Sequence, residues 1–445
     1  MTTTVRFAPS PSGRLHVGNI RAALTNFLFA RKTGGRFMLR LDDTDAAKST
    51  QAFADGILED LAWLGLTHDI FARQSDRAAQ HAAAAERLKA AGRLYPCYET
   101  ADELDRRRKR LMAQHKPPIY DRAGLRLSDD ERAALEAAGR RPHWRFKLSG
   151  RTVEFNDVIR GAVHVDTASV SDPVLIREDG QFLYTLPSVV DDIEFGITHI
   201  IRGEDHVTNT GPQIEIFEAL GAQAPVFAHF SMLVGPGGDA LSKRIGSLSI
   251  SDLRASGYQA QAINSLLARL GTSDPVEARA TLDELVAGFD LSRFSRAPAH
   301  FDPEDMKKLN HKLLHSMPFE AVEGELRRAG VAGGQAFWEA VRDNISLVTD
   351  AGAWWTVVQG PVTPVISNPE LAAAAVELMP DGPFTEATWS EWTRAIGAKT
   401  GAKGKELFMP LRLGLTGHEH GPEMKKLLPL IGPERARKRL SGQVA

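Results

Sequence analysis

The chain has 445 residues, of which 43% are hydrophobic and 25% are charged, a composition typical of a soluble globular protein with about three domains. Its only cysteine, Cys97, excludes an intrachain disulfide framework and suits the reducing cytosol. The net charge of −2 gives no global sign of nucleic-acid binding, so any basic surface must be local. Residues 1–4 lack the basic start of a signal peptide, and no apolar run approaches the length of a membrane span. We therefore expect a cytoplasmic protein without a membrane partner.

The segment Val5–Asp45 has the pattern of a strand, a helix and a second strand. Val5–Ala8 is rich in β-forming residues and is followed by two prolines, which predicts a short strand. Apolar residues then recur at helical spacing over residues 20–28, and two glycines end that helix before a second strand at Phe37–Leu41. The unit is therefore βαβ, with a right-handed crossover.

His16 and Gly18 fall at or near the amino end of this helix, where free N–H groups and the helix dipole attract phosphate. A single histidine there is more often a capping or solvated residue than a catalytic one, but its neighbours favour chemistry. Leu15–Asn19 (LHVGN) resembles the HIGH motif of class I aminoacyl-tRNA synthetases, with asparagine in place of the final histidine. The strings Arg6–Gly13 (RFAPSPSG) and Leu41–Asp45 (LDDTD) are similar to those of bacterial glutamyl-tRNA synthetases.

A second phosphate-handling signal is Ala240–Arg244 (ALSKR), which follows a glycine-rich hinge at Gly235–Gly238. It resembles the KMSKS loop of class I synthetases in the form of the glutamate branch. Because it comes after His16 in the family's order and spacing, both signals would close on one triphosphate. The resemblance implies ATP with Mg²⁺ and makes His16, Gly18 and Lys243 catalytic. It assigns ATP contacts to His16, Gly18, Asn19, Ser242, Lys243 and Arg244.

His199–Asp205 (HIIRGED) predicts a buried strand whose apolar run ends in charge. Ligands of open α/β sheets bind beyond the carboxyl ends of strands, so Arg202 is a candidate for an amino-acid pocket, whereas surface charges at a strand end are the default alternative. The resemblance implies L-glutamate as the substrate. It assigns glutamate contacts to Arg6, Ala8, Ser10, Asp42, Tyr184, Ser188 and Arg202. Asp42 stands where many relatives have Glu, and it does not decide the substrate, because the glutaminyl branch also has Asp at the matching place. Ser188 stands where some relatives have Asn, which concerns one side-chain contact.

Strand patterns at Trp144–Leu148, Val153–Val158 and Ala162–Val165 predict a mixed α/β insertion in the Rossmann fold. Before them, a capping box at Thr100 opens a helix with five adjacent cations. A charge run is usually a solvated helix face, and a phosphate-contacting face is an equal alternative here. The candidate tRNA contacts of this helix are Arg106, Arg107, Arg108, Lys109 and Arg110.

Cys97 also indicates whether the chain has a zinc-binding site. Some bacterial glutamyl-tRNA synthetases hold zinc in this region through a Cys-x-Cys pair and later ligands. In this chain Glu99 stands at the second position of that pair. Because one thiolate does not make a structural zinc site, we expect no zinc.

The carboxy-terminal part has predominantly helical patterns, and Lys405–Gly417 resembles a stretch of the family's helical domain, although a plain core helix would also explain its apolar residues. Residues 391–445 carry eleven Lys or Arg and five Glu, a net charge of +6, which leaves −8 for residues 1–390. This asymmetry suits a module that meets RNA phosphates, with Arg412 as a candidate contact.

The resemblance implies an α/β Rossmann-type catalytic domain with an inserted α/β acceptor-binding domain, followed by an all-α anticodon-binding region. We expect the catalytic halves at residues 1–77 and 183–237, the inserted acceptor-stem domain at 78–182, a stem-contact region with the KMSKS-like loop at 238–315, and the anticodon-binding region at 316–445.

The resemblance covers essentially the whole chain. It implies a monomeric glutamate:tRNA ligase that charges tRNA(Glu) through glutamyl-adenylate, while a paralogue that also or instead charges tRNA(Gln) stays open. Three rivals fit less well. Glutaminyl-tRNA synthetase has a β-barrel carboxy-terminal region, a queuosine-glutamylating paralogue lacks the anticodon-binding region, and a catalytically inactive tRNA-binding protein would not need His16, Gly18 and Lys243.

Overall fold

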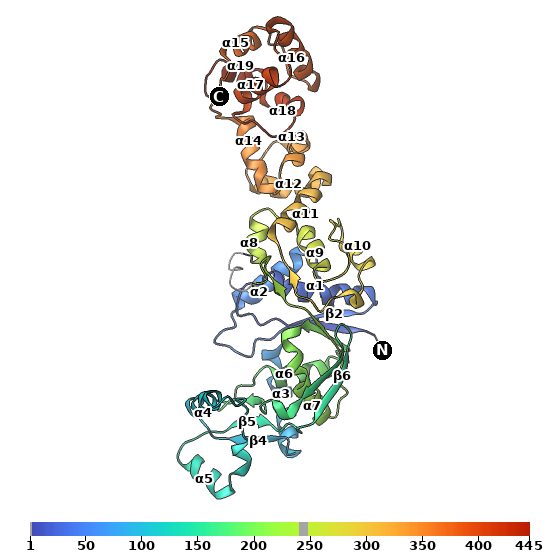
Figure 1. Cartoon of the computed structure of the whole chain (residues 1–445), viewed down its shortest axis with the longest axis vertical. Coiled ribbons are helices and arrows are strands. Elements are labelled where there is room, and N and C mark those ends of the chain that lie inside the picture. Colours follow the sequence, from blue (N-terminus) through green and yellow to red (C-terminus); the bar gives the residue numbers. More distant parts are fainter. Residues whose placement is uncertain (1, 240–247) are drawn as a thin grey trace. The chain divides into compact units, whose positions relative to one another are not determined.

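The computed structural model describes residues 2–239 and 248–445, which fold into two compact units. The first unit is Met1–Asp252 with Ile263–Asp302, and the second is Leu253–Ala262 with Pro303–Ala445. All strands among the described residues lie in the first unit (Figure 1). The KMSKS-like segment Ala240–Arg244 lies outside the described residues. None of the described helices combines the length and the apolar character needed to cross a membrane.

The βαβ unit predicted at the amino terminus is confirmed. β1 (Thr4–Phe7), α1 (Val17–Lys32) and β2 (Arg36–Leu41) follow in order, and β2 pairs in parallel with both β1 and β3 (Ile70–Arg73). One apolar face of α1 is buried, and this burial supplies most of the helix's stability. The buried face comprises Ile20, Ala23, Leu24, Phe27 and Leu28.

A four-stranded sheet in the order β7-β6-β10-β9 continues the nucleotide-binding fold. β9 (His199–Gly203) and β10 (Val226–Phe230) are parallel, and the N–H of Thr198, just before β9, donates to a carbonyl of β1 across 2.9 Å. β6 (Thr152–Asp157) pairs in parallel with β10 and antiparallel with β7 (Gly161–Asp166). The carboxyl ends of β1, β9 and β10 therefore lie together.

β6 and β7 match the strand patterns of the sequence, which place them in the inserted segment 78–182. In the structure they extend the sheet of β10 instead of forming a sheet of their own. Phe155 of β6 packs edge-on against Phe227 of β10, with ring centroids 5.5 Å apart. The alternating pattern predicts a strand, but it does not say which distant strand will be its partner.

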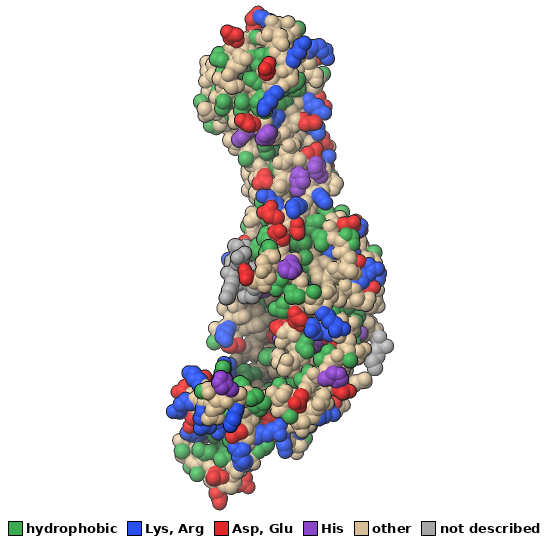
Figure 2. Space-filling model, in the orientation of Figure 1, with side chains coloured by type: hydrophobic (Ala, Val, Ile, Leu, Met, Phe, Trp, Pro, Cys, Tyr) green, Lys and Arg blue, Asp and Glu red, His purple; other side chains and the backbone are tan. Residues whose placement is uncertain are grey.

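The rest of the inserted segment contains a small antiparallel sheet of β4 (Leu94–Cys97), β5 (His143–Phe146) and β8 (Val174–Ile176). α4 (Ala101–Ala113) begins with the predicted capping box. It has no buried residue, and Lys and Arg side chains gather over it (Figure 2). α4 is therefore a solvent-facing helix with a basic surface.

The other elements of the first unit are α2 (Gln51–Trp63), α3 (Ala78–Ala90), α5 (Asp129–Ala137), α6 (Thr185–Glu194), α7 (Val207–Ala219), α10 (Leu282–Ala287), and the paired strands β11 (Leu233–Val234) and β12 (Ala299–His300). Two helices, α8 (Ile250–Ala255) and α9 (Ala260–Arg269), each contribute residues to both units. α6 and α7 pack on the apolar core beside β10, so they carry side chains toward the carboxyl ends of the strands.

The second unit is helical throughout its described residues, which confirms the all-α carboxy-terminal region. Its main helices are α11 (Pro303–Ser316), α12 (Phe319–Arg328), α13 (Gly334–Val341), α14 (Ala351–Gln359), α15 (Pro369–Glu377), α16 (Glu386–Thr400), α17 (Lys405–Thr416), α18 (Met424–Ile431) and α19 (Pro433–Leu440). A continuous apolar core includes the buried rings of Trp338 and Trp392. The β-barrel expected of glutaminyl-tRNA synthetase does not form from these residues.

Candidate active site

The carboxyl ends of β1, β9 and β10 and the amino end of α1 surround a cavity of about 870 Å³ in the first unit. Ten of the active-site candidates named from the sequence line it: Arg6, Ala8, Ser10, His16, Gly18, Asn19, Asp42, Tyr184, Ser188 and Arg202. The remaining active-site candidates, Ser242, Lys243 and Arg244, lie outside the described residues. The structure thus brings together every active-site candidate that it describes, at the sheet edge where ligands bind in this fold.

His16 is the N-cap of α1, and its two ring nitrogens have different roles. Nδ1 accepts the N–H of Gly18 across 3.1 Å, while the backbone N–H of His16 donates to Oδ1 of Asn19, also across 3.1 Å. Nδ1 is therefore unprotonated, and Nε2 carries the ring hydrogen. Burial lowers the pKa of His16, which favours this neutral form. The capping and catalytic interpretations are compatible, because Nε2–H can still donate to a phosphate.

Gly18 lies in close contact with this ring. A Cβ at position 18 would lie 3.0 Å from Cε1 and 3.1 Å from Nδ1 of His16. A side chain there would push the imidazole away from the N–H that holds it. The lack of a side chain at Gly18 therefore lets the imidazole keep this position.

A buried ion network supports the wall of the cavity near Asp42. Asp192 accepts from Nε of Arg6 at 3.2 Å and from Nη1 of Arg40 at 2.8 Å. Arg40 also donates to Asp42 at 2.7 Å and to the hydroxyl of Ser188 at 3.3 Å. Burial raises the pKa of Asp42, and the Arg40 guanidinium opposes this rise. Ser188, which departs from the family pattern, thus helps to hold Arg40.

Arg40 and Asp192 are not among the residues predicted from the sequence, although Arg40 gives a signal. It is 1% exposed within the otherwise apolar run Phe37–Leu41, and a charge inside an apolar strand requires a partner. Asp192 gave none, because it lies 152 residues from Arg40 and 186 residues from Arg6 in the sequence.

Arg202 has a different environment from Arg6. Its Nε donates to Nε2 of His229 at 3.1 Å, and its Nη2 donates to Oγ1 of Thr210 at 2.8 Å and to Oε1 of Gln213 at 2.7 Å. These partners are neutral, and no carboxylate of the described residues forms an ion pair with Arg202 within 4.0 Å. Burial, with a smaller contribution from the charge of Arg6, lowers the pKa of Arg202 to about 10, so the guanidinium is charged at neutral pH.

Three further glutamate candidates offer polar groups or space to a ligand. Tyr184 is 45% exposed, and its hydroxyl oxygen accepts from Nδ2 of Asn209 at 3.0 Å, which leaves the O–H hydrogen to donate. Ser10 is exposed and Ala8 is half-buried. The backbone N–H of Asp42 donates to the carbonyl of Pro9 across 2.9 Å, which holds the loop after β1 next to the Asp42 carboxylate.

Known proteins agree with this geometry. A family model described as tRNA synthetases class I (E and Q), catalytic domain, matches residues 2–308. The chain belongs to this family of class I tRNA synthetases. A second model, described as an anticodon binding domain, matches residues 367–444 of the synthetase.

Similar synthetases cover the chain from end to end. Glutamate--tRNA ligase 2 of Methylobacterium radiotolerans is 60% identical over 445 residues, which is 100% of both chains. Glutamate--tRNA ligase 1 of Parvibaculum lavamentivorans is 62% identical over 440 residues, which is 98% of each chain. A crystal structure of a glutamate tRNA ligase from Elizabethkingia meningosepticum, in complex with its amino acid, has a TM-score of 0.88 and 27% identity and covers 99% of each chain.

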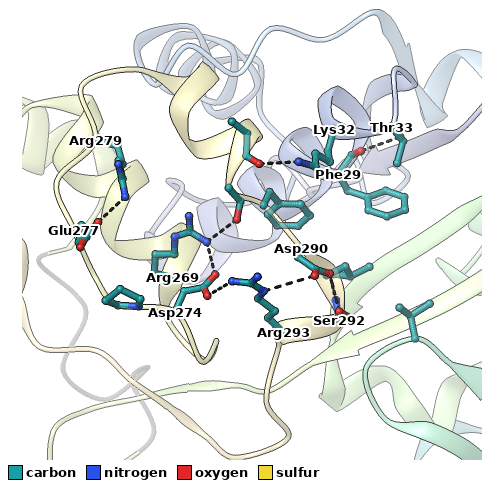
Figure 3. Close-up of a pocket in the computed structure, with 16 residues that line it drawn as sticks. Phe29, Lys32, Thr33, Arg269, Asp274, Glu277, Arg279, Asp290, Ser292 and Arg293 are labelled. Carbon is teal, nitrogen blue, oxygen red and sulfur yellow. Dashed lines mark hydrogen bonds and ion pairs between the residues drawn. The ribbon is translucent and has the colours of Figure 1, made fainter.

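The synthetase has a second cavity in the first unit, of about 690 Å³ (Figure 3). Asp274 accepts from Arg269 at 2.6 Å and also pairs with Arg293, while Glu277 pairs with Arg279 at 2.5 Å. These arginines have carboxylate partners, unlike Arg202. Lys32 in the same cavity donates to the carbonyl of Ala287. Because the predicted motif residues line the first cavity, the first cavity is the candidate active site.

Near Cys97, the structure gathers three groups that could ligate a metal ion. Cys97, Glu99 and His143 offer ligand atoms within 4.8 Å of one another, and His143 is not among the residues predicted from the sequence. However, Nε of Arg145 donates to Nε2 of His143 at 3.3 Å, and the hydroxyl of Tyr120 donates to Glu99 at 2.9 Å. Burial raises the pKa of the Cys97 thiol to about 11. A zinc ion would have to displace the guanidinium from Nε2 of His143 and the proton from the thiol, and it would find only one cysteine.

Proposed function

We propose that the chain ligates L-glutamate to tRNA(Glu) in an ATP-dependent reaction of protein synthesis. The α-carboxylate of glutamate attacks the α-phosphate of ATP, which forms glutamyl-adenylate and releases pyrophosphate. The 2′-OH of the terminal adenosine of the tRNA then attacks the activated carbonyl carbon, and AMP leaves. Membership of the class I family and full-length relatives named glutamate--tRNA ligase support this reaction.

The charge of Arg202 is the main support for glutamate as the substrate, because its hydrogen-bond partners in the protein are all neutral. A buried cation with a lowered pKa and no carboxylate in direct contact is costly until an anion arrives, and the charges of Asp192 and Asp205 offset only part of this cost. The γ-carboxylate of glutamate would supply that anion, whereas the amide of glutamine would not. Arg6 is already paired with Asp192, so it adds a second and weaker positive charge to the same substrate.

The other groups of the cavity would fix the orientation of glutamate. The carboxylate of Asp42 and the hydroxyl of Ser10 would hold the α-ammonium, and the free O–H of Tyr184 would donate a directional hydrogen bond. Ala8 and Ser188 would line the same pocket. These contacts position the α-carboxylate for attack, which is the main contribution that a protein makes to such a transfer.

In the ATP-binding part of the cavity, the protein would position the triphosphate and stabilise its negative charge. His16 would donate Nε2–H to the triphosphate, Gly18 would leave room for the nucleoside, and Asn19 would hold the histidine. Ser242, Lys243 and Arg244 would add their groups from the KMSKS-like segment. Mg²⁺ would enter with ATP and neutralise part of the triphosphate charge.

For tRNA, we propose a contact on the basic surface of α4. Arg108 and Arg110 are exposed, and neither forms an ion pair within 4.0 Å with any carboxylate in the part of the chain that the structure describes. Arg107 and Lys109 already have carboxylate partners. Arg412 is half-buried and donates both Nη groups to a backbone carbonyl at 3.0 Å, so it is a weaker candidate.

We assign the catalytic halves to residues 1–77 and 183–237, the acceptor stem to the inserted segment 78–182, the stem contact to residues 238–315, and the anticodon to residues 316–445. We expect a monomer that works in the cytoplasm. Whether tRNA(Gln) is also a substrate is an outcome of the test below.

The test is aminoacylation by the purified full chain with each pairing of L-glutamate or L-glutamine and tRNA(Glu) or tRNA(Gln). We expect ATP-dependent charging of tRNA(Glu) with glutamate and none with glutamine. Glutamate on both tRNAs would identify the non-discriminating form of the enzyme. Charging with glutamine in preference to glutamate would contradict the proposal.

A further inference from the structure

Three side chains on neighbouring strands form a chain of hydrogen bonds that ends at the active site. Asp157 is the last residue of β6, His229 lies on β10, and Arg202 lies on β9 directly opposite His229 in the register. The side chains of Asp157 and His229 are fully buried, and Nδ1 of His229 lies 2.6 Å from Oδ2 of Asp157. Neither residue lines the active-site cavity, whereas Arg202 does.

The carboxylate determines which nitrogen of His229 carries the hydrogen. An ionised carboxylate only accepts, so Nδ1 must be the donor. Burial lowers the pKa of His229, which keeps the ring neutral and leaves Nε2 as a bare acceptor. Nε2 faces the Nε–H of Arg202 at 3.1 Å and also lies 3.1 Å from Oγ1 of Thr210, which itself accepts from Nη2 of Arg202. The opposite tautomer would place two N–H groups against each other.

We propose that Asp157 and His229 are positioning residues for the amino-acid substrate: Asp157 fixes the tautomer of His229, and that tautomer orients Arg202 toward the γ-carboxylate. This inference rests on the proposed role of Arg202 in binding glutamate. Asp157 would therefore influence substrate affinity although it does not touch the substrate.

The backbone around Asp157 allows a sharp test. Oδ1 of Asp157 accepts the N–H groups of Ile159 at 2.9 Å, Arg160 at 2.8 Å and His229 at 3.2 Å. In Asp157→Asn, the amide oxygen would keep these three bonds, so the amide NH₂ must face Nδ1 of His229. The variant keeps the volume of the side chain but forces Nδ1 to accept, which moves the ring hydrogen to Nε2, against Arg202.

The first measurement is the KM for glutamate of the full chain in aminoacylation of tRNA(Glu). We expect Asp157→Asn to raise it by about ten- to a hundredfold, the scale of one hydrogen bond to a charged group, with the KM for ATP unchanged. Long-range ¹⁵N–¹H NMR of histidine-labelled protein should show the His229 hydrogen on Nδ1 in the wild type and on Nε2 in the variant. The His229 resonance is assigned by its loss in His229→Gln.

Asp172→Asn is the matched control, because Asp172 is another buried aspartate with hydrogen-bonded partners outside the active-site cavity. We expect it to lower the Tm at least as much as Asp157→Asn without raising the KM for glutamate. A general loss of packing would instead raise this KM in both variants.

A double-mutant cycle tests the route through His229. Glutamine at position 229 can turn its amide oxygen toward Arg202 whatever stands at position 157. Adding Asp157→Asn to His229→Gln should therefore cost little further glutamate affinity. The inference is overturned if the two effects add in full, if the NMR tautomer does not change, or if Asp157→Asn leaves the KM for glutamate unchanged while Arg202→Ala raises it. An unaffected Arg202→Ala enzyme would overturn the proposed role of Arg202 as well.

Discussion

Asp192 pairs with Arg6 inside the active-site wall, with Oδ1 3.2 Å from Nε. The same carboxylate accepts from Arg40 at 2.8 Å, so one anion serves two buried arginines. Arg202 has no such partner among the described residues and is held by three neutral groups. Of the four arginines that line the cavity, Arg6 and Arg40 pair with carboxylates and Arg21 is held by backbone carbonyls behind the wall. Arg202 would therefore offer its charge to the side-chain carboxylate of a dianionic amino acid.

Lys243 is expected to act in the transition state of adenylate formation. Lys243→Ala should slow ATP–pyrophosphate exchange, measured with glutamate and tRNA present, by roughly 10² to 10³, as when one preorganised charge-stabilising donor is lost. The affinity for tRNA should change little. Lys147→Ala, which removes an exposed lysine of the first unit, is the control. Unaltered exchange in folded Lys243→Ala protein would remove this lysine from the mechanism.

The pH dependence of ATP use should report on His16. Its pKa is lowered from 6.5 by burial, and the neutral ring is needed because Nδ1 accepts from Gly18. Activity should therefore be flat above about pH 6.5 and should fall as the pH drops through the lowered pKa. The measurement is kcat/KM for ATP against pH for the wild type and His16→Gln. The variant should be slower and should lack this acid limb; an identical limb in both proteins would assign it to another group.

The sequence predicts the parts of the site that lie within short segments. The βαβ unit and the ten cavity-lining candidates come from local patterns and motifs. Asp192, His229 and Asp157 escape such reasoning, because their roles depend on partners on distant elements. Arg40 gives the signal of a charge in an apolar strand, but its partners on α6 are not encoded locally. Phe227 of β10 pairs with Asp157, 70 positions earlier, and no local pattern encodes that register. For the same reason, local patterns do not predict that β6 and β7 pair with the sheet of the Rossmann fold.

The cluster at Cys97 should not bind zinc stoichiometrically. Elemental analysis of the purified protein should find well under one zinc per chain, and chelators should not change the Tm. Arg145→Ala provides a contrast, since it removes the guanidinium that occupies His143; any zinc affinity should rise in this variant. One tightly held zinc per wild-type chain would contradict the assignment of this cluster.

The basic surface of α4 should contribute to tRNA binding through charge alone. The double variant Arg108→Ala, Arg110→Ala should bind tRNA more weakly. The slope of log K against log salt concentration should fall in magnitude by up to about two, since each lost phosphate contact removes about one. ATP–pyrophosphate exchange at saturating tRNA should be unaffected. Lys109→Ala is the control on the same helix, because this lysine is already paired with Asp105 at 2.7 Å. An unchanged salt slope in the double variant would indicate a merely solvated helix face.

The ratio of kcat/KM for glutamate to that for glutamine measures whether Arg202 recognises the γ-carboxylate. The wild type should prefer glutamate by about 10⁴ or more, because a site built for a specific polar partner rejects the analogue that lacks it. Arg202→Ala should lower kcat/KM for glutamate by roughly 10² to 10³, the cost of breaking a buried charge pair, and should leave glutamine equally poor or slightly better. Wild-type kcat/KM for glutamate in Arg202→Ala would contradict the account and make Arg6 the better candidate.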